Sequence, residues 1–232
     1  EFKDVVFEYI PDVPVLNGIN LKIKKGQTIA FVGNSSGGKT TLVNLIPRFY
    51  DVKSGAIMID GVDIRNYTLK SLRQNIAIVF QDNFLFSGTI RENIMLGNEN
   101  ATEEELQQAI KMAYLDDFIE SLENKENTFI GERGVLLSGG QKQRLTIARA
   151  LVGQLEILIL DDSLSALDFA TDAALRKAIA GLEGDVTTFL VSQRISGIRQ
   201  ADKILVMDNG SLAGQGTHEE LMESCETYQE IY

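Results

Sequence analysis

The chain has 232 residues, 44% of them hydrophobic, which is enough for one large domain or two small ones with a buried core. Its 33 acidic and 22 basic residues give a net charge of −11, which argues against a nucleic-acid-binding surface but allows a local basic pocket. A single cysteine, Cys225, excludes an internal disulfide and suits a reducing compartment. No apolar run reaches roughly 18 residues, and the N-terminus has no signal-peptide pattern.

Strand and turn signals dominate the first third of the chain. A strand pattern begins at Phe2, so we expect the chain to be a piece of a longer protein. A turn is predicted near Pro11 and Pro14, and Asp60-Gly61 predicts a hairpin. The predicted elements are strands over 2–9, 19–23, 28–32, 56–59 and 76–80 and helices over 40–49 and 69–74.

Helical patterns replace strands in the middle third. Thr102 with Glu105 and Ser138 with Gln141 are capping boxes, each followed by apolar residues at helical spacing. We therefore expect a single domain over 1–232. Its core would cover about 1–83 and 152–232, and a helical subdomain would cover about 84–151.

The last third returns to alternating strands and helices. The run over 155–160 is almost continuously apolar, as a parallel sheet buried on both faces requires. The other predicted elements are a helix over 169–182, a strand over 187–191, a hairpin of 204–207 with a strand near Leu212, and a last helix with Leu221, Cys225, Tyr228 and Ile231 on its apolar face. Thr217 with Glu220 would cap that helix, and His218 beside the cap is predicted at the surface.

Residues 33–40 fit the phosphate-binding loop G-x-x-x-x-G-K-[ST], between a predicted strand and a predicted helix. Glycines let backbone N–H groups approach phosphate oxygens, and the helix N-terminus adds partial positive charge. Lys39 would reach the β- and γ-phosphates, and the Thr40 hydroxyl would bind Mg²⁺. A Gly-rich turn before a helix is the simpler alternative. The candidate nucleotide-binding residues here are Gly33, Asn34, Ser35, Ser36, Gly37, Gly38, Lys39, Thr40 and Thr41.

Two further motifs favour a nucleotide site. Asp161 ends an apolar strand in the Walker B pattern and would hold Mg²⁺ directly or through water. Leu137 is followed by Ser138, Gly139, Gly140 and Gln141 at the start of a predicted helix, where a hydroxyl and backbone N–H groups form a second phosphate-binding end. Two such ends in one chain make sense if each nucleotide is sandwiched between two chains.

With these motifs the chain resembles the nucleotide-binding domain of an ABC transporter over essentially residues 2–232. The resemblance implies an α/β fold of the P-loop NTPase (RecA-like) type: a mostly parallel sheet core, an N-terminal antiparallel β subdomain and an inserted α-helical subdomain. It also implies ATP and Mg²⁺ as cofactors, ATP hydrolysis, and a second nucleotide-binding domain as partner. The transmembrane domains would be absent from this chain, which would work on the cytoplasmic side of the cell membrane.

The resemblance also implies residue roles. Tyr9 matches the aromatic that stacks on adenine, although it could be a plain edge-strand aromatic. Gln81 matches the Q-loop glutamine, which touches Mg²⁺ or the attacking water and reports to the membrane part. Residues 130–134 resemble the X-loop that contacts the transmembrane domains, and with 84–94 they favour the exporter branch. The D-loop pattern, which crosses to the other subunit, is Ser165-Ala166-Leu167-Asp168.

Three positions depart from the family pattern. Asp162 stands where the family has its catalytic Glu, and its side chain is about 1.5 Å shorter than that general base. Gln193 stands in place of the switch His and can donate a hydrogen bond but cannot carry a proton. Ser36 replaces a loop glycine that commonly has positive φ, so we expect positive φ or a distorted loop there, with a strain of roughly 1–2 kcal/mol.

These departures leave three hypotheses. The first is the half of a heterodimeric exporter whose own site hydrolyses ATP poorly while its intact signature, 137–141, completes the partner's site. The second is an ordinary homodimeric ABC ATPase in which Asp162 works well enough. The third is a soluble ABC ATPase outside transport, which the X-loop pattern argues against. A P-loop kinase or GTPase would not explain the signature, and no N-K-x-D guanine motif is present.

Overall fold

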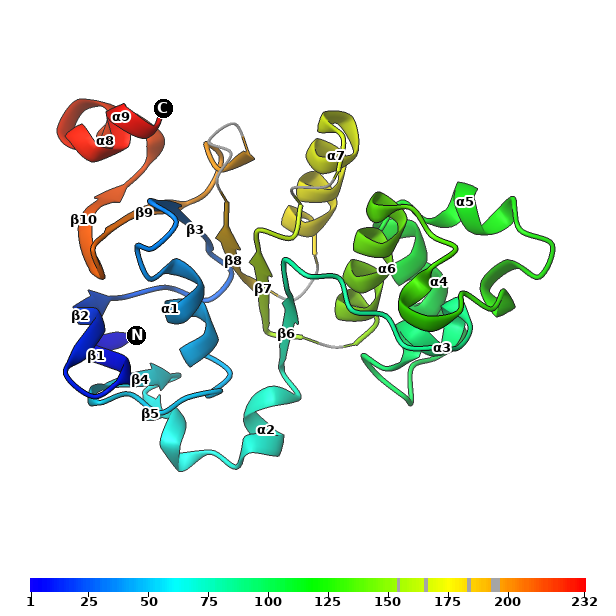
Figure 1. Ribbon diagram of the computed structural model, residues 1–232, viewed down its shortest axis with the longest axis horizontal. Helices are drawn as coiled ribbons and strands as arrows, with labels where there is room; N and C mark the ends of the chain where they lie inside the picture. The colour runs from blue at the N-terminus through cyan, green and yellow to red at the C-terminus, as the bar shows by residue number, and fades with distance from the viewer. Residues whose placement is uncertain (154, 165–166, 183–184, 193–196) are drawn as a thin grey trace.

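Two β-sheets and a group of helices make up the part of the chain that the computed structural model describes, residues 1–153, 155–164, 167–182, 185–192 and 197–232 (Figure 1). The first sheet is antiparallel, in the order β2-β1-β4-β5. Its strands are β1 (Phe2–Ile10), β2 (Val13–Leu21), β4 (Ser54–Ile59) and β5 (Val62–Asp63). Pro14, predicted in a turn, therefore lies inside β2, which begins six residues before the predicted strand.

The second sheet has the order β10-β9-β3-β8-β7-β6, and every neighbouring pair except β9 and β10 is parallel. Its strands are β3 (Thr28–Gly33), β6 (Ile76–Val79), β7 (Ile157–Asp161), β8 (Thr187–Val191), β9 (Lys203–Asp208) and β10 (Ser211–Gly216). Ile29 and Phe31 of β3 pack into the core beneath the antiparallel sheet, and Ala30 and Val32 pack into the core on the other face. The middle residues of β3, β7 and β9 are buried on both faces, which explains the apolar runs in these strands.

The helices divide between the sheets and a separate group. In Figure 1, α3 to α6 gather at one end of the molecule, while α1 and α7 lie on opposite sides of the large sheet. The capping boxes predicted at Thr102 and Ser138 are present at the starts of α4 and α6. The helices are α1 (Lys39–Leu45), α2 (Leu69–Arg73), α3 (Ile90–Met95), α4 (Glu103–Met112), α5 (Asp116–Glu120), α6 (Gly139–Leu151), α7 (Phe169–Ala180), α8 (His218–Ser224) and α9 (Glu226–Ile231). This mixed α/β architecture, with one antiparallel and one mostly parallel sheet, confirms the predicted fold class.

The C-terminal segment corrects two predictions. The single last helix is broken at Cys225, whose extended backbone (φ −124°, ψ 101°) separates α8 from α9. His218, predicted at the surface, is buried, and its Nδ1 lies 2.8 Å from the Tyr228 hydroxyl. Because the break lets α9 pack beside the start of α8, the buried Tyr228 covers the imidazole that a single straight helix would leave exposed.

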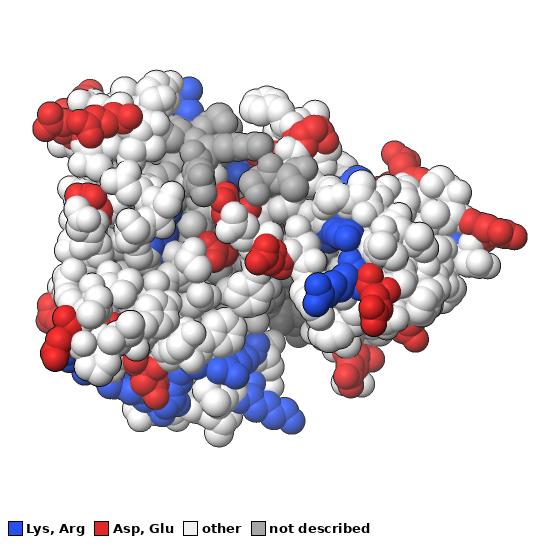
Figure 2. All heavy atoms as spheres, viewed as in Figure 1, with Lys and Arg blue, Asp and Glu red and all other residues white. Residues whose placement is uncertain are grey.

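Surface charge is unevenly placed. Figure 2 shows Lys and Arg side chains gathered near β5 and α2, at the edge of the antiparallel sheet. Carboxylates neutralise much of this cluster, since Arg65 pairs with Asp63 and Arg48 with Asp51, each at 2.6 Å. Among the residues with described structure, no helix is long and apolar enough to cross a membrane.

Candidate nucleotide-binding site

The loop between β3 and α1 turns without a left-handed residue at Ser36. Gly37 N donates to Asn34 O at 2.9 Å, which closes a turn around Ser35 and Ser36. Ser36 is not among the described residues with positive φ, so the predicted positive φ is wrong. The left-handed step falls instead on Gly38, at φ 90°, where the chain enters α1. The chain therefore first reverses in a turn around Ser35 and Ser36, and the left-handed residue is Gly38, two residues after Ser36.

Close packing requires glycine at both ends of this loop. Gly33 has φ 131°, and a Cβ there would lie 1.9 Å from the Met207 carbonyl oxygen of β9. A Cβ on Gly38 would lie 2.8 Å from Leu16 Cδ2 of β2. The loop is therefore clamped between the two sheets, and its backbone position is set by strands on either side.

A buried lysine and two adjacent carboxylates face this loop. Lys39 is 6% exposed, and its Nζ donates to Gly33 O at 2.7 Å and Asn34 O at 2.5 Å. Burial lowers the pKa of Lys39, while the charges of Asp162 and Asp161 oppose that shift. Burial likewise raises the pKa of Asp161, which the Thr40 hydrogen bond opposes and the neighbouring Asp162 reinforces. The site is thus a desolvated cluster of one cation and two acids, where added phosphate and metal charges would be felt strongly.

Two oxygens at this cluster fit the predicted Mg²⁺ site. The Thr40 hydroxyl donates to Asp161 Oδ1 at 2.9 Å, so the first turn of α1 and the end of β7 present a hydroxyl and a carboxylate side by side. Hard oxygen donors of this kind are what Mg²⁺ prefers, and Thr40 and Asp161 would hold it. When bound, the ion would neutralise charge on the β- and γ-phosphates. Gln81 lies exposed after β6, and no described hydrogen bond joins it to Thr40 or Asp161.

Tyr9 lies beside the same loop. Its hydroxyl is 3.2 Å from Thr41 Oγ1 in α1, and half of the residue is exposed. Phe7 and Tyr50 both meet its ring edge to face, with centroids 4.8 Å and 5.1 Å away. This aromatic group holds the Tyr9 ring at the loop with surface left for a flat ligand.

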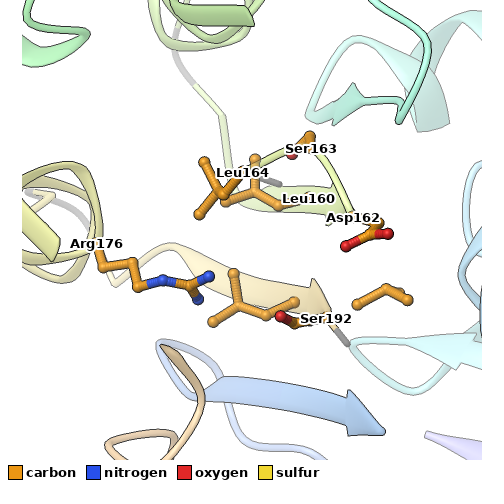
Figure 3. A pocket seen from close by; sticks show the side chains of 8 residues that line it. Leu160, Asp162, Ser163, Leu164, Arg176 and Ser192 are labelled. Carbon is orange, nitrogen blue, oxygen red and sulfur yellow. The ribbon is translucent and has the colours of Figure 1, made fainter. Parts of the chain in front are cut away.

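Asp162 connects two strand ends. Its backbone N donates to Val191 O at 2.9 Å, and its own φ is 46°. With Ser163, Ser192 and Arg176 it lines a small chamber behind the strand ends (Figure 3). Gln193, predicted beside the γ-phosphate, lies outside the described residues, although Ser192 immediately before it is placed at the end of β8.

The second phosphate-binding end is remote from the first within this chain. Ser138 Oγ accepts from Gln141 N at 3.3 Å, and Gln141 Oε1 accepts from Ser138 N at 2.8 Å. These residues start α6, which lies across β6 and β7 from α1 in Figure 1. A Cβ on Gly139 would meet nothing within 4 Å. Packing within the described chain therefore does not explain the glycine, and Gly140 follows it in the same exposed first turn.

Asp168 caps α7 at its exposed start. Its carboxylate accepts from Thr171 N at 3.0 Å and from Thr171 Oγ1 at 2.7 Å. These hydrogen bonds hold the pKa of Asp168 below its usual range. Phe169, next to it, is 74% exposed. Ser165 and Ala166 of the predicted D-loop lie outside the described residues.

Sequence reasoning missed a polar network in which side chains of α3 and α6 hold the segment that follows Gln81. Asn93 is 1% exposed, and its Oδ1 accepts from Arg149 at 2.8 Å and from Phe86 N at 2.9 Å. Arg149 also donates to Phe84 O at 2.9 Å. This network holds Phe84 and Phe86 with more than half of each residue exposed. The run of three apolar residues, Phe84-Leu85-Phe86, in a segment without regular structure was the available signal.

Comparisons with known proteins agree with this arrangement. The family described as "ABC transporter" matches residues 16–165. The chain therefore belongs to the ABC transporter family, whose ATP-binding domains are ATPases.

Two curated relatives and one solved structure illustrate the match. The "Putative multidrug export ATP-binding/permease protein YgaD" of Bacillus subtilis (strain 168) is 49% identical over 233 residues, which is 100% of this chain and 40% of that protein. A protein of the same description from Staphylococcus aureus (strain NCTC 8325) is 51% identical over 98% of this chain and 40% of its own length. A bacterial Atm1-family ABC exporter with ATP bound superposes with a TM-score of 0.95 at 42% identity, covering 99% of this chain and 41% of that one. The chain thus spans 40% of the length of these two relatives.

Proposed function

We propose that this chain is the Mg-ATP-binding domain of an ABC exporter and that it turns over ATP slowly at its own site. The Lys39, Thr40 and Asp161 cluster supports Mg-ATP binding, and the exporter relatives support the transport role. The observation that carries slow turnover is Asp162 at the position of the general base. Its backbone is tied to β8, so the missing methylene of Glu cannot be regained by sliding the strand end forward.

A second copy of the domain, or a related partner, would complete the nucleotide site. The signature residues Ser138 to Gln141 stand exposed at the start of α6, and Gly139 has open space around it. Backbone N–H groups at a helix start that nothing crowds are suited to a phosphate brought by another chain. Asp168 and the exposed Phe169 would lie on the same dimer face.

The transmembrane part would dock on the helical group, taken as residues 84–151. A groove of ≈ 660 Å³ runs between the Phe84 and Phe86 loop and the X-loop, and it is lined by Arg133 and Val135 as well. Exposed aromatic and aliphatic side chains held by a buried polar network suit a rigid helical partner. On this proposal the chain would lie on the cytoplasmic side of a membrane, and Gln81, three residues before Phe84 in the chain, would report nucleotide state to the transmembrane part.

Slow turnover is tested by restoring the family residues. The variant Asp162→Glu with Gln193→His should raise single-turnover hydrolysis of Mg-ATP by about 10²-fold, since a general base misplaced by about an ångström costs that much. Asp162→Asn is the matched control, because it keeps the side-chain length and removes the base. Its rate should stay close to that of the unaltered chain.

Three outcomes would overturn the proposal. Equal rates for the unaltered chain and the restored variant would show that Asp162 positions water as well as Glu does. Robust hydrolysis by the unaltered chain with a quadratic dependence on its concentration would instead support an ordinary homodimeric ATPase. Absence of Mg-ATP binding to the unaltered chain and to every variant would show that these residues do not form a nucleotide site.

A further inference from the structure

We propose that Gly210 is a positioning residue for nucleotide binding: it holds β2 so that Tyr9 stands at the distance from the phosphate loop that a bound nucleotide requires. This inference rests on the proposed Mg-ATP-binding function of the same site. The hydrogen bond of Gly210 outside its own hairpin goes to β2, so its effect on the base would pass through that strand.

Gly210 stands in the tight turn between β9 and β10. Asn209 and Gly210 both have positive φ, at 44° and 76°, and Asp208 pairs with Ser211 across them. Two left-handed residues in a two-residue hairpin loop form a type I′ turn, for which Asn-Gly is a favoured sequence. The conformation of the turn is therefore set by its own residues, and it can act as a fixed support for whatever packs against it.

The segment that packs against this turn is β2. The Gly210 carbonyl oxygen accepts from Asn17 N at 2.8 Å, and the Asn209 carbonyl oxygen accepts from Asn17 Nδ2 at 3.3 Å. A Cβ on Gly210 would lie 2.2 Å from the Val15 carbonyl oxygen. Because the obstructing atom belongs to the backbone, any larger residue at Gly210 would have to push β2 away from the turn.

The phosphate loop meets β2 at the same place. A Cβ on Gly38 would lie 3.2 Å from the Val15 carbonyl oxygen and 3.8 Å from Gly210 Cα. The loop and the turn also belong to one sheet, since Gly33 at the end of β3 pairs with Met207 of β9. The turn therefore places β2 relative to the same strands that carry the phosphate loop.

A shift of β2 at Val15 would reach Tyr9. The register of β1 with β2 is irregular here, and its successive pairs are Phe7 with Leu16, Glu8 with Pro14, and Ile10 with Val13. Val15 is thus an extra residue of β2, and Tyr9 is an extra residue of β1 on the other side of one pair. Bulges bend a strand and re-aim its side chains. The direction of the Tyr9 ring depends on this bend, which the support at Val15 maintains.

The Tyr9 ring and the phosphate loop would bind opposite ends of one nucleotide. The Tyr9 hydroxyl lies 3.2 Å from Thr41 Oγ1, so the ring is held beside the first turn of α1. A preorganised site gains affinity because the two binding surfaces already stand at the right distance. Moving β2 would spoil that distance for the base and leave the triphosphate contacts of the loop in place.

The test separates base recognition from phosphate binding. Gly210→Ala should weaken Mg-ATP binding by at least about fivefold in isothermal titration, since loss of stacking on one base costs about 5- to 150-fold. The Kd of inorganic tripolyphosphate with Mg²⁺, which offers phosphates and no base, should change by less than about twofold.

Gly61→Ala is the matched control. Asp60 and Gly61 form the same kind of two-residue turn between β4 and β5, with φ 50° and 77°, but a Cβ on Gly61 would meet nothing within 4 Å. This variant has the same left-handed strain without the contact to β2. Both dissociation constants should therefore stay within about twofold of those of the unaltered chain.

A double-variant cycle tests whether the effect passes through Tyr9. Gly210→Ala should cost no further Mg-ATP affinity in a Tyr9→Leu background, where the stacking surface is already gone. Multiplied losses in the double variant would overturn the inference. Equal losses for Mg-ATP and tripolyphosphate, or an Mg-ATP affinity unchanged by Gly210→Ala, would overturn it as well. If tripolyphosphate binds too weakly to titrate, the cycle alone decides.

A milder variant covers the case in which Gly210→Ala melts below the assay temperature. Asn17→Ala removes the hydrogen bond to the Asn209 carbonyl oxygen and keeps the backbone contacts, so it should weaken Mg-ATP binding by at least about twofold. An unchanged affinity would then overturn the inference. If the unaltered chain binds neither Mg-ATP nor tripolyphosphate, the proposed function fails first, and the two failures are distinguishable.

Discussion

Replacing Asp161 by Asn should stabilise the nucleotide-free protein while destroying Mg-ATP binding. Asp161 is 4% exposed at the end of β7, and burial beside Asp162 raises its pKa. Asn keeps an oxygen that can accept from Thr40 but carries no charge to desolvate. Removing a buried charge that is kept for function typically adds about 0.5–2 kcal/mol to the free energy of unfolding. For a domain of this size that corresponds to a rise in Tm of about 2–4 °C per kcal/mol.

The pH dependence has a definite sign. An acid whose folded pKa lies above its unfolded value binds more protons when folded, so its contribution to stability is present at low pH and is lost as pH rises through the folded pKa. The stability advantage of Asp161→Asn should therefore be small near pH 4 and grow toward pH 7. Thermal unfolding of both proteins at several pH values measures this difference directly.

Added Mg-ATP should make the unaltered protein more stable than the Asp161→Asn variant. A ligand at 100 times its Kd stabilises the folded state by about 2.7 kcal/mol, which the unaltered protein would gain and Asp161→Asn would largely lose. Glu223→Gln, which removes an exposed carboxylate from α8, is the control and should change stability by less than about 0.5 kcal/mol. A nucleotide-free Asp161→Asn protein that melts below the unaltered one at pH 7 would refute the reasoning.

Three further predictions follow from single contacts. Gly33→Ala should cost about 4 kcal/mol or more in chemical denaturation, because its Cβ would overlap the Met207 carbonyl oxygen; a cost below 1 kcal/mol would contradict the clamp. Tyr228→Phe should cost about 1–3 kcal/mol by leaving the buried His218 without its partner, with Mg-ATP affinity unchanged by isothermal titration. Tyr9→Leu should weaken Mg-ATP binding by about 1–3 kcal/mol in the same titration with little change in Tm, and unaltered affinity would argue against base stacking.

Strand burial and helix capping were predictable because both leave local patterns. Strand β7 is buried on both faces of the large sheet, so Ile157 to Leu160 had to be apolar. Thr102 and Ser138 mark helix starts because a hydroxyl must satisfy backbone donors there. The break at Cys225 was not predictable, because Leu221, Cys225 and Tyr228 keep helical spacing across it. The interaction that favours the break, the packing of Tyr228 on His218, is a tertiary contact that leaves no local pattern.

Some features of the candidate site were likewise predictable from local sequence patterns, and others depend on distant packing. The pairing of Thr40 with Asp161 could be anticipated because a glycine-rich loop and the end of an apolar strand are local signals that meet at one edge of a parallel sheet. The positive φ expected at Ser36 was wrong because the position of a left-handed residue depends on how the loop is clamped, here by Leu16 and Met207 from distant strands. The contact of Gly210 with Val15 left no local signal, since it depends on where the β9–β10 turn packs against β2.

The strand order also has a consequence for biosynthesis. β3, β8 and β7 are neighbours in the large sheet, yet they begin at residues 28, 187 and 157. The phosphate loop leaves the ribosome before Asp161, the carboxylate proposed to hold Mg²⁺, which lies 121 residues beyond Thr40, and β8 between their strands comes later still. Pairings so distant in the chain form late and slowly. A nascent chain thus has no complete site to offer ATP until most of the domain has been made, and nucleotide can then trap only molecules that have finished folding.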